Sequence, residues 1–236
     1  MKDLISVIIP SFNRFEYLKN AVNSVLNQTY DNLEIIVIND ESSDPKYYKE
    51  DLDKSVKVLN IKRENYPDWG GSRQPLRNLG ANISKGNYLA FLDDDDLWMP
   101  NKLEVQMKEM ASIKSLFSST EGFYGEGPYN IQKKYPLYNK DHFYKIIKKK
   151  YKKTKYFKNN TYPSIWDFDF LNIHNCVILS SVVINKELFE RVGGFRGLPV
   201  RADYDLWLSV LKLTNLLYID IPLFYYDGHH GEGKNY

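Results

Sequence analysis

The sequence has only one cysteine, Cys176, among its 236 residues. A single cysteine excludes an internal disulfide and a metal site built from cysteines. Its neighbours Val177 and Ile178 are apolar, which predicts a buried and unreactive thiol. No apolar run approaches the ~20 residues that a membrane-spanning helix needs, and no leader-like segment precedes the first strand-like run. We therefore expect a globular protein of the cytoplasm.

An excess of one charge is also lacking, because 32 Lys and Arg face 30 Asp and Glu and leave a formal net charge of +2. The distribution is nevertheless uneven. Residues 133–158 contain eleven lysines and one acidic residue, Asp141, so the rest of the chain is acidic. The sequence thus describes an acidic body that carries one basic segment. Its length suits one sizeable core, and two full domains would be cramped.

Four consecutive carboxylates stand near the middle of the sequence. Residues 88–92 are all apolar or aromatic, and they run directly into Asp93, Asp94, Asp95 and Asp96. The apolar run predicts a strand buried on both faces, as in a parallel sheet. Adjacent carboxylates repel one another, and a divalent cation at the end of the strand would stabilise them. A solvated acidic turn without a ligand is the alternative.

Strand-like and helix-like runs alternate through the first hundred residues. Asn13, with Glu16 three residues later, is typical of a capping box and predicts the start of a helix. The runs predict strands at 4–9, 33–38, 56–61 and 88–92, and helices up to residue 26, at 72–84 and after Pro100. This alternation predicts an α/β fold with a Rossmann-like, mostly parallel central sheet and flanking helices.

The second half is less regular. We predict strands at 115–124, 177–184, 216–221 and 223–226, helices at 186–192 and 203–213, and a Gly-rich loop at 122–128. In the basic segment, helical spacing gives one basic face and one apolar face formed by Phe143, Ile146, Ile147 and Tyr151. Three interpretations of that segment stay open: a solvated loop with a packed helix, an amphipathic face against anionic lipid, and nucleic-acid binding, which the acidic body disfavours.

Seven stretches together resemble the family 2 glycosyltransferases, and they occur in that family's order. They are VIIPSFNR (7–14), NQTY (27–30), EIIVIND (34–40), RNLG (77–80), FLDDDDLWMP (91–100), VGGF (192–195) and DYDLWL (203–208). The resemblance covers about two thirds of the chain, and residues 125–172 match nothing in the family's pattern. It implies one GT-A domain over residues 1–236. Residues 1–100 would bind the nucleotide-sugar, and residues 101–236, with a Lys-rich insertion near 133–158, would bind the acceptor.

The resemblance also implies a donor and a metal ion. Family members use a nucleotide-diphospho-sugar, so we expect a UDP-sugar, with GDP- and dTDP-sugars as alternatives. Mn²⁺ or Mg²⁺ would neutralise the leaving diphosphate. The residues that match the donor pocket are Pro10, Ser11, Phe12, Asn13, Asp40, Arg77 and Asp94, and those that match the metal site are Asp95, Asp93 and His229.

Several of these assignments have alternatives. In the family pattern Asp94 faces the ribose and Asp95 the metal, but Asp93 or Asp96 could take either role because four Asp are adjacent. His230 competes with His229, and a solvated tail would give neither a role. Asn39 stands where the family has a further Asp. Asp40 alone is also typical of an Asx turn, and Arg77 of the surface of a helix.

Asp203 matches the family's catalytic base. The leaving diphosphate needs no proton, so one base that activates the acceptor hydroxyl is enough. Ala202 stands where the family has Glu, and an Asp at the start of a helix is also typical of a cap. We expect Asp205 to be structural.

The resemblance therefore implies metal-dependent, inverting transfer of a sugar to the hydroxyl of a carbohydrate or lipid-linked acceptor, in the synthesis of a surface polysaccharide or glycan. We expect a cytoplasmic location, with peripheral contact at the inner face of the membrane as an open alternative, and no nucleic-acid partner. A rival interpretation is a non-catalytic module that binds a nucleotide-sugar. A nucleotidyltransferase would need a Gly-rich loop after the first strand, and residues 10–14 lack one.

Overall fold

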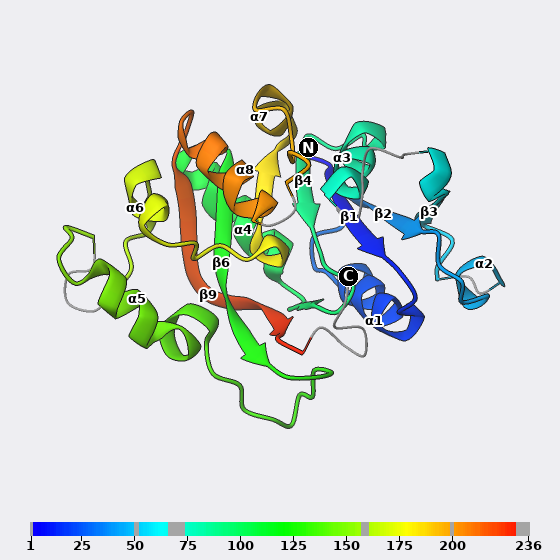
Figure 1. Cartoon of the computed structure of the whole chain (residues 1–236), viewed down its shortest axis with the longest axis horizontal. Coiled ribbons are helices and arrows are strands. Elements are labelled where there is room, and N and C mark those ends of the chain that lie inside the picture. Colours follow the sequence, from blue (N-terminus) through cyan, green and yellow to red (C-terminus); the bar gives the residue numbers. More distant parts are fainter. Residues whose placement is uncertain (1, 50–51, 66–73, 157–160, 199–200, 230–236) are drawn as a thin grey trace.

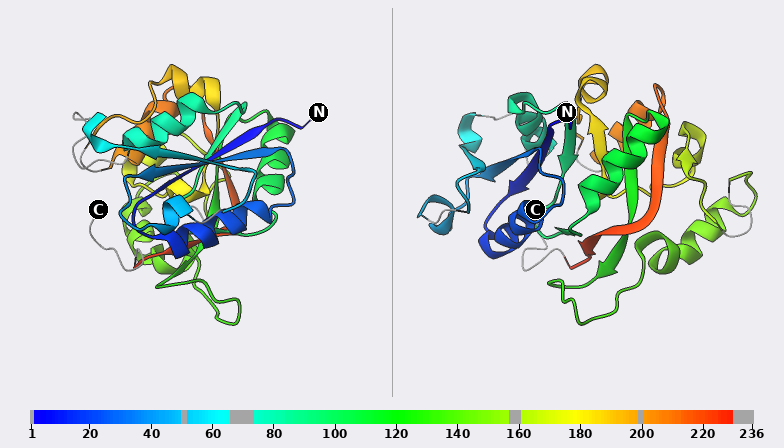
Figure 2. Two further views of the ribbon diagram at one scale, coloured as in Figure 1. Left: turned by 90° about the vertical axis from the view of Figure 1, so that its right-hand side faces the viewer. Right: turned by 180° about the vertical axis from the view of Figure 1, so that it is seen from behind.

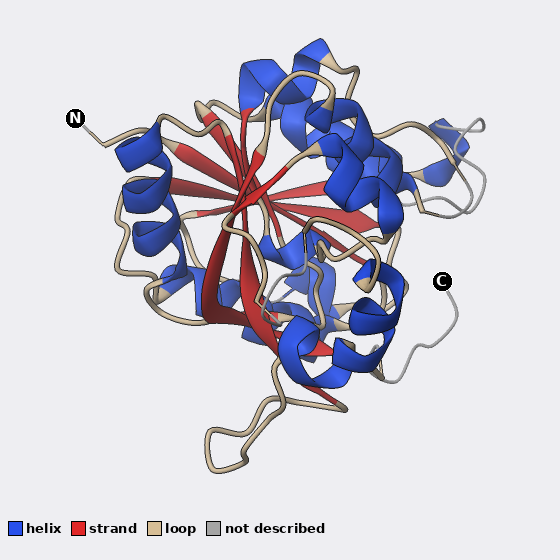
Figure 3. Cartoon of the chain, turned by 90° about the vertical axis from the view of Figure 1, so that its left-hand side faces the viewer, coloured by secondary structure: helices blue, strands red, loops and turns tan. Residues whose placement is uncertain are grey.

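The computed structural model describes residues 2–49, 52–65, 74–156, 161–198 and 201–229. Within these ranges the chain forms one nine-stranded sheet in the order β3-β2-β1-β4-β8-β6-β9-β5, and β7 pairs with β9. Helices cover both faces of this twisted sheet (Figures 1 and 3). The architecture is α/β, as predicted. No helix in the described ranges is both long enough and apolar enough to cross a bilayer.

The amino-terminal half of the sheet is parallel. Its strands are β1 (Ile5–Ser11), β2 (Leu33–Asp40), β3 (Val56–Ile61) and β4 (Tyr88–Phe91). Every residue of β1 is buried because helices cover both of its faces, which explains its uninterrupted apolar run. All four strands lie where the sequence predicts them. Their pairing also sets the register, since Ile8 of β1 pairs with Phe91 of β4.

Helices of this half lie on opposite faces of the sheet. They are α1 (Phe15–Leu26), α2 (Lys46–Lys49), α3 (Gln74–Ile83) and the short 3₁₀ turn η1 (Arg63–Asn65). The core under α1 and α2 contains one face of β1, and the core under α3 contains the other. Gly80 lets α3 approach β1 closely, because a Cβ atom at this position would lie 2.5 Å from Cγ2 of Ile8.

The carboxyl-terminal half of the sheet is mixed. Its strands are β5 (Leu97–Trp98), β6 (Phe117–Gly125), β7 (Ile165–Trp166), β8 (Val183–Asn185) and β9 (Leu216–Asp227). Only β6 and β9 pair in parallel, and the other pairs of this half are antiparallel. The sheet is therefore parallel in the half predicted with most regularity, and antiparallel pairs enter where the pattern loosens.

Two strand predictions in this half are wrong in detail. The run 177–184 is a strand only at its end, because Leu179–Ser181 forms a 3₁₀ turn, η4. Conversely, the two strands expected around Pro222 are one strand, β9. Pro222 is tolerated because it lies opposite Glu121 at a shift in the β6–β9 register, where a ladder hydrogen bond is already lost.

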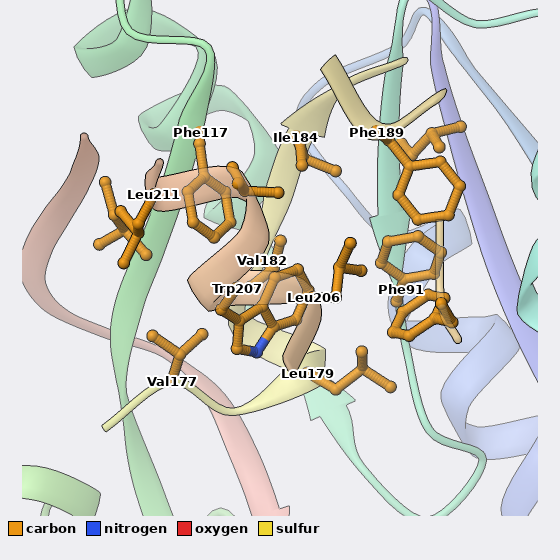
Figure 4. Close-up of a cluster of buried hydrophobic side chains, with 14 of the residues drawn as sticks. Phe91, Phe117, Val177, Leu179, Val182, Ile184, Phe189, Leu206, Trp207 and Leu211 are labelled. Carbon is orange, nitrogen blue, oxygen red and sulfur yellow. The ribbon is translucent and has the colours of Figure 1, made fainter. Parts of the chain in front are cut away.

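Within the described ranges, the second half of the chain contributes five α-helices and one π-helical turn. They are α4 (Lys102–Ile113), α5 (Tyr144–Tyr151), α6 (Phe168–Ile173), α7 (Lys186–Arg191), α8 (Ala202–Leu211) and the single π-helical turn η3 (Tyr138–His142). Figure 4 shows Leu206 and Trp207 of α8 pointing into a cluster that includes Phe117 of β6. The Trp207 and Phe117 rings lie 5.4 Å apart. This packing holds the first turn of α8 against the sheet.

The basic segment forms a helix, but its apolar face is already covered. Ile147 and Tyr151 of α5 are buried in the core, and Phe143 packs against the same cluster. Only Ile146, with 46% of its surface exposed, remains open on this helix among the predicted apolar positions. Figure 2 shows α5 at one edge of the molecule, away from the parallel strands. The alternative of an apolar face free to bind lipid is therefore wrong, and α5 is a packed helix that presents mainly its lysines to solvent.

The predicted capping box at the start of α1 is also wrong. Arg14 occupies the cap position without a side-chain hydrogen bond. Asn13 adopts a left-handed backbone conformation, with φ of 52°. Its Oδ1 accepts hydrogen bonds from the backbone amides of Ser43 and Asp44, at 2.8 and 3.2 Å. Asn13 therefore joins the ends of β1 and β2 and does not cap the helix.

Candidate active site

The four carboxylates lie where parallel strands end. In parallel register, the residue after Ile8 pairs with the residue after Phe91, so the end of β1 lies level with the acid turn, residues 93–96. The backbone amide of Asp96 donates to the carbonyl of Asp93 at 3.1 Å and closes the turn. Ligand sites of open α/β sheets form at this carboxyl edge. The four acids therefore lie at the end of a buried strand, where the sequence predicts them.

Arg14 binds two carboxylates of the acid turn. Its Nη1 lies 3.2 Å from Oδ1 of Asp94 and 2.7 Å from Oδ2 of Asp95, and all three side chains are at least nine-tenths buried. Ser11 Oγ donates to the other oxygen of Asp94 at 2.6 Å. Tyr47 OH lies 2.5 Å from Ser11 Oγ and completes the contact. The buried charges of Asp94 and Asp95 are therefore compensated by one arginine.

Arg77 binds the first carboxylate of the turn. It forms an ion pair with Asp93 and is buried, so the alternative of a surface helix residue is wrong. The close approach of α3 at Gly80 brings Arg77 to the carboxyl edge. Asn78, on the same helix, accepts from the backbone amide of Phe195 at 2.9 Å and donates to its carbonyl at 2.7 Å. Two stretches of the family pattern are thus tied to each other.

Asp96 has a different environment from its neighbours. It accepts a hydrogen bond from Ser180 Oγ at 2.5 Å and another from the backbone amide of Asp227 at 3.0 Å. Burial, and then the charges of Asp95 and Asp93, raise the pKa of Asp96 well above its ordinary value. Ser180 Oγ also accepts from the amide of Asp93 at 3.1 Å. Asp96 therefore fastens the acid turn to η4 and to the end of β9.

The ends of β1 and β2 form the predicted donor pocket. Pro10 and Ser11 are buried in β1, and Phe12 beyond them has 38% of its surface exposed. Asp40 at the end of β2 is 4% exposed and binds Arg63 of η1 in a bidentate ion pair, with Nε 2.6 Å from Oδ1. The side-chain contact to the loop that follows β2 belongs to Asn39, whose Oδ1 accepts from the Ser42 amide, three residues on, at 3.1 Å. The Asx-turn alternative for Asp40 is therefore wrong.

Asp203 lies in the first turn of α8. The cap position is occupied by Arg201, with φ of 58°, so Asp203 is not the cap residue. Burial raises the pKa of Asp203, the charge of Arg77 lowers it, and the charge of Asp93 raises it. Asp203 therefore lies near enough to the Arg77–Asp93 pair for both charges to act on its pKa. Asp205 instead pairs with Arg196 through Oδ2 and Nε at 2.6 Å, as expected for a structural residue.

His229 lies in the turn after β9. Its Nε2 is 3.1 Å from Oε2 of Glu126, and its side chain is 51% exposed. Its backbone amide donates to Oδ1 of Asp227 at 2.9 Å. His230 lies outside the described residues. Within the described ranges, no group of three or more His, Cys, Asp or Glu comes together in a geometry that could hold a metal ion.

A cavity of about 210 Å³ lies against the acid turn. Its wall comes from α1, from the turn itself and from the loop after β6, through Tyr17, Asn20, Asp95, Asp96, Leu97, Pro128 and Tyr129. Asp95 therefore faces both Arg14 and open space. At this position the Asp95 carboxylate could contact a ligand in the cavity while it keeps its ion pair with Arg14.

Three contacts of the site were missed by sequence reasoning. Arg14 stands inside a stretch that carries the resemblance, yet nothing in the sequence indicates which acid it binds. Arg63 follows β3 by two residues, and its partner Asp40 ends the adjacent strand, so strand order could have suggested the pair. Ser180 lies in a run that looks like a strand, and no sequence signal predicts its contact with Asp96.

The model of the family described as Glycosyl transferase family 2 matches residues 6–166. An uncharacterized glycosyltransferase of Rickettsia typhi is 33% identical over 91% of this chain and 61% of its own length. The Escherichia coli protein WfgD, named a UDP-Glc:α-D-GlcNAc-diphosphoundecaprenol β-1,3-glucosyltransferase, is 30% identical over 90% of this chain and 72% of its own. The chain spans between 16% and 61% of the length of five Rickettsia relatives.

Solved structures share the fold. Staphylococcus aureus TarS, residues 1–349 in complex with UDP-GlcNAc, aligns with a TM-score of 0.67 at 18% identity, over all of this chain and 62% of that one. The mannosyltransferase PcManGT of Pyrobaculum calidifontis, in complex with GDP-Man and Mn²⁺, aligns with a TM-score of 0.63 at 15% identity, over 94% of this chain and 55% of that one. The fold of this chain is therefore that of these glycosyltransferases.

Proposed function

Because the chain belongs to glycosyl transferase family 2, we propose that it moves a sugar from a nucleotide-diphospho-sugar to an acceptor hydroxyl, with inversion at the anomeric carbon. The observation that carries the proposal is the Arg77–Asp93 ion pair at the carboxyl edge, which lies near enough to Asp203 of α8 for both charges to act on its pKa. Asp203, from the second half of the chain, and the acid turn, from the first half, would thus lie on two sides of one ligand site. That arrangement suits a donor between them and an acceptor beside the base.

The donor's nucleotide would lie over the ends of β1 and β2. Phe12 has a partly exposed aromatic ring that could stack on the nucleobase, and Asp40, which is paired with Arg63, has a carboxylate at the same edge of the sheet. Asn13 fixes the loop between them. A UDP-sugar is favoured, since UDP-GlcNAc is bound by the structurally similar TarS, and GDP and dTDP remain alternatives. Arg77 is placed to meet the diphosphate, because guanidinium groups suit phosphate oxygens.

A divalent cation fits the donor set of the acid turn. Asp95 and Asp93 supply hard carboxylate oxygens, the type that Mn²⁺ and Mg²⁺ prefer, and His229 lies after the neighbouring strand β9. Since the described side chains do not form a complete cluster, oxygens of the diphosphate would have to complete the coordination. A cation bound there would neutralise the charge of the leaving diphosphate. PcManGT, which shares the fold, holds Mn²⁺ together with GDP-Man.

Asp203 would remove the proton from the acceptor hydroxyl. Burial and the charge of Asp93 raise its pKa, which makes it a better proton acceptor than an exposed Asp. A single base on the side opposite the leaving diphosphate gives one direct displacement, and one displacement inverts the anomeric centre. Ser11 and Arg14 hold Asp94 and Asp95 in place while this happens.

The acceptor would be a carbohydrate or a lipid-linked sugar, as in surface polysaccharide synthesis. The relative WfgD is named for an acceptor linked to diphosphoundecaprenol. The lysines of α5 would then meet the anionic inner surface of a membrane through charge alone, because the apolar face of that helix is buried. We retain the expectation of a cytoplasmic location and of no nucleic-acid partner.

The direct test is donor cleavage. The protein is incubated with UDP-, GDP- and dTDP-sugars with and without Mn²⁺, and released nucleotide is measured, because bound donors are slowly hydrolysed when water replaces the acceptor. We expect cleavage of at least one donor that depends on Mn²⁺. No cleavage of any donor, together with tight nucleotide binding, would favour the rival function of a non-catalytic nucleotide-sugar-binding module.

The metal assignment has its own test. Asp95→Asn should abolish Mn²⁺-dependent binding of the nucleotide, measured by calorimetry with UDP, GDP and dTDP. Asp141→Asn is the matched control, since Asp141 is exposed and lies in η3. An unchanged Mn²⁺ dependence in Asp95→Asn would show that the cation is held elsewhere.

A further inference from the structure

An aromatic surface lies at the carboxyl ends of β6 and β9. We define the aromatic wall as the rings of Tyr124, Tyr138 and Tyr226. The Tyr138 and Tyr226 rings lie 5.4 Å apart at 80°, and the Tyr124 and Tyr226 rings lie 6.2 Å apart. All three side chains are half-buried, so each keeps part of its surface open. The wall is assembled from β6, η3 and β9, which come together only in the fold.

Two neighbouring rings pack on the aromatic wall. His142 stacks on Tyr124 with ring centroids 3.5 Å apart, and Phe143 lies 4.8 Å from Tyr138. Phe143 also packs against the core cluster that contains Trp207 of α8. The wall and the helix that carries Asp203 therefore share one rigid core.

The wall adjoins the acid turn. Tyr226 directly precedes Asp227, whose backbone amide donates to Oδ1 of Asp96 at 3.0 Å. Burial raises the pKa of Tyr138, and the charges of Asp96 and Asp203 raise it further. The Tyr138 hydroxyl hydrogen-bonds to no other residue in the described ranges, which leaves it available to a ligand. The wall thus adjoins the acid turn through Asp227, and Tyr138 lies near enough to Asp203 for that charge to act on its pKa.

We propose that Tyr138 and Tyr226 bind the acceptor, by stacking on the apolar face of a pyranose ring whose hydroxyl points to Asp203. The inference rests on the proposed function, because only an acceptor needs to lie beside the base on the side away from the nucleotide pocket. The C–H groups of a pyranose carry partial positive charge, and the face of a phenol ring carries partial negative charge. Pockets for small polar ligands combine such apolar walls with a few directed polar groups. Here Asp203 and the Tyr138 hydroxyl are those groups.

The other face of β9 provides a matched control. Tyr225 points away from the wall and packs on Tyr129 and Tyr135, with ring centroids 5.2 and 4.9 Å away. Tyr225 is fully buried. Tyr135 lies in the loop after β6, and its replacement therefore removes a tyrosine that packs on the other side of β9 without touching the wall.

The test measures pyranoside binding by saturation-transfer NMR. The ligands are the methyl glycosides of glucose, galactose, mannose and N-acetylglucosamine, added to the protein with UDP and Mn²⁺. At least one glycoside should receive saturation from the parent protein. Tyr138→Leu and Tyr226→Leu should weaken that binding about three- to tenfold, the size of one lost aromatic stack. Tyr138→Phe should keep most of it, because the ring remains, and Tyr135→Leu should leave it unchanged.

Thermal midpoints and the UDP-induced shift of each variant show whether it is folded and still binds nucleotide. If a leucine variant does not fold, Tyr138→Phe keeps the test decisive. A rise in the dissociation constant of the glycoside in Tyr138→Phe as large as that expected for leucine would show that stacking is not the contact. Equal binding in the parent and the leucine variants, or no glycoside bound by the parent, would overturn the inference. Failure of donor cleavage is a separate result: it removes the proposed function, while glycoside binding is read independently of it.

Discussion

The two halves of the sheet hold their buried carboxylates in different ways. In the amino-terminal half, arginines hold them: Arg63 binds Asp40, Arg77 binds Asp93, and Arg14 binds Asp94 and Asp95. In the carboxyl-terminal half, amides and hydroxyls hold them. Glu121 accepts from the amides of Asn139 and Lys140, at 3.0 and 3.2 Å, and from Tyr218 OH at 3.0 Å.

The difference separates exchangeable from fixed carboxylates. A carboxylate held by an arginine is held by a charge, and a metal ion or a phosphate can compete for either partner of the pair. A carboxylate held by backbone amides loses those bonds if it moves, and the amides are left unsatisfied. Ligand chemistry is therefore expected at the ion-paired acids, and structural anchoring at Glu121 and Asp227. Asp96 is the acid of the turn that is held in the second way, by a hydroxyl and an amide, and it should also be an anchor.

Asp203 is where the two halves meet, and its replacement should have the largest effect. Asp203→Asn keeps the size of the side chain but cannot accept a proton. Transfer or donor hydrolysis should fall about a hundred- to ten-thousand-fold, the typical loss for a general base. Donor affinity and the thermal midpoint should barely change. Asp205→Asn is the matched control on the same helix, because it breaks the pair with Arg196 and should lower stability without such a loss of rate.

The same residue predicts a pH dependence. Burial and, less strongly, the charge of Asp93 raise the pKa of Asp203, whereas the backbone of Tyr204 and the charge of Arg77 lower it, with a net rise. The base is active when deprotonated, so the rate should fall as the pH falls through a midpoint above the ordinary Asp value of about 3.9. This fall in rate at low pH, the acid limb of the pH profile, is measured as the rate of donor hydrolysis against pH at saturating Mn²⁺. A limb at or below the ordinary value, or the same limb in the residual activity of Asp203→Asn, would assign the base to another group.

Arg14→Met tests whether the ion-paired half is exchangeable. Asp94 and Asp95 would remain buried without the Arg14 guanidinium, and breaking a buried pair from one side typically costs about 3–5 kcal/mol. Urea unfolding of the metal-free variant should show this loss. Mn²⁺ with UDP should stabilise the variant more than it stabilises the parent, because a metal ion can replace the missing charge. Equal stabilisation of both proteins would mean that Arg14 and the metal do not act on the same acids.

Glu121→Ala tests the fixed half and should have a smaller effect. It removes the acceptor for three amides, those of Gly122, Asn139 and Lys140, and for one hydroxyl, and unsatisfied buried donors cost roughly 1–3 kcal/mol. Glu121→Gln keeps one acceptor oxygen and should lose less. Neither variant should respond to Mn²⁺ differently from the parent, as thermal shift with and without UDP would show. An altered metal response would contradict the division between the halves.

Charge removal on α5 should have the smallest effect. Replacement of Lys148, Lys149 and Lys150 by Gln should leave stability and donor cleavage unchanged, since these side chains are exposed. Co-sedimentation with anionic vesicles should weaken, by no more than about 1 kcal/mol per lysine at low salt, and should vanish at high salt. Binding to neutral vesicles that equals binding to anionic ones would leave α5 as a packed helix with a solvated basic face.

The parallel half could be predicted from sequence because local pattern and burial agree there. β1, β2 and β4 are apolar runs buried on both faces, and their lengths and order follow from the chain. Register then predicts that Ser11 lies level with the acid turn. The mixed half could not be predicted in the same way. Ser180 and Ser181 interrupt an apolar run with a turn whose hydroxyls contact Asp93, Asp96 and Ser119, residues distant in the sequence.

The partners of the charged residues were the hardest to predict. Arg14 and Asp95 are separated by 81 positions, and a charge carries no periodicity that indicates its partner. Asn13 was misassigned because the capping pattern is local, whereas its actual contacts lie 30 and 31 residues away. Cys176 was correctly predicted to be buried, because its neighbours alone decide its environment.

The hydrogen bond from the Asp227 amide to Asp96 joins residues 131 positions apart. Closing so long a loop is entropically costly and slow compared with forming local turns. During synthesis, the parallel strands and α3 would emerge and pack long before β9 exists. The acid turn would therefore lack the Asp227 bond to Asp96 until the end of the last strand has been synthesised. Ligand competence would be among the last properties that the folding chain acquires, and shortening β9 at its carboxyl end would disable a turn encoded more than a hundred residues earlier.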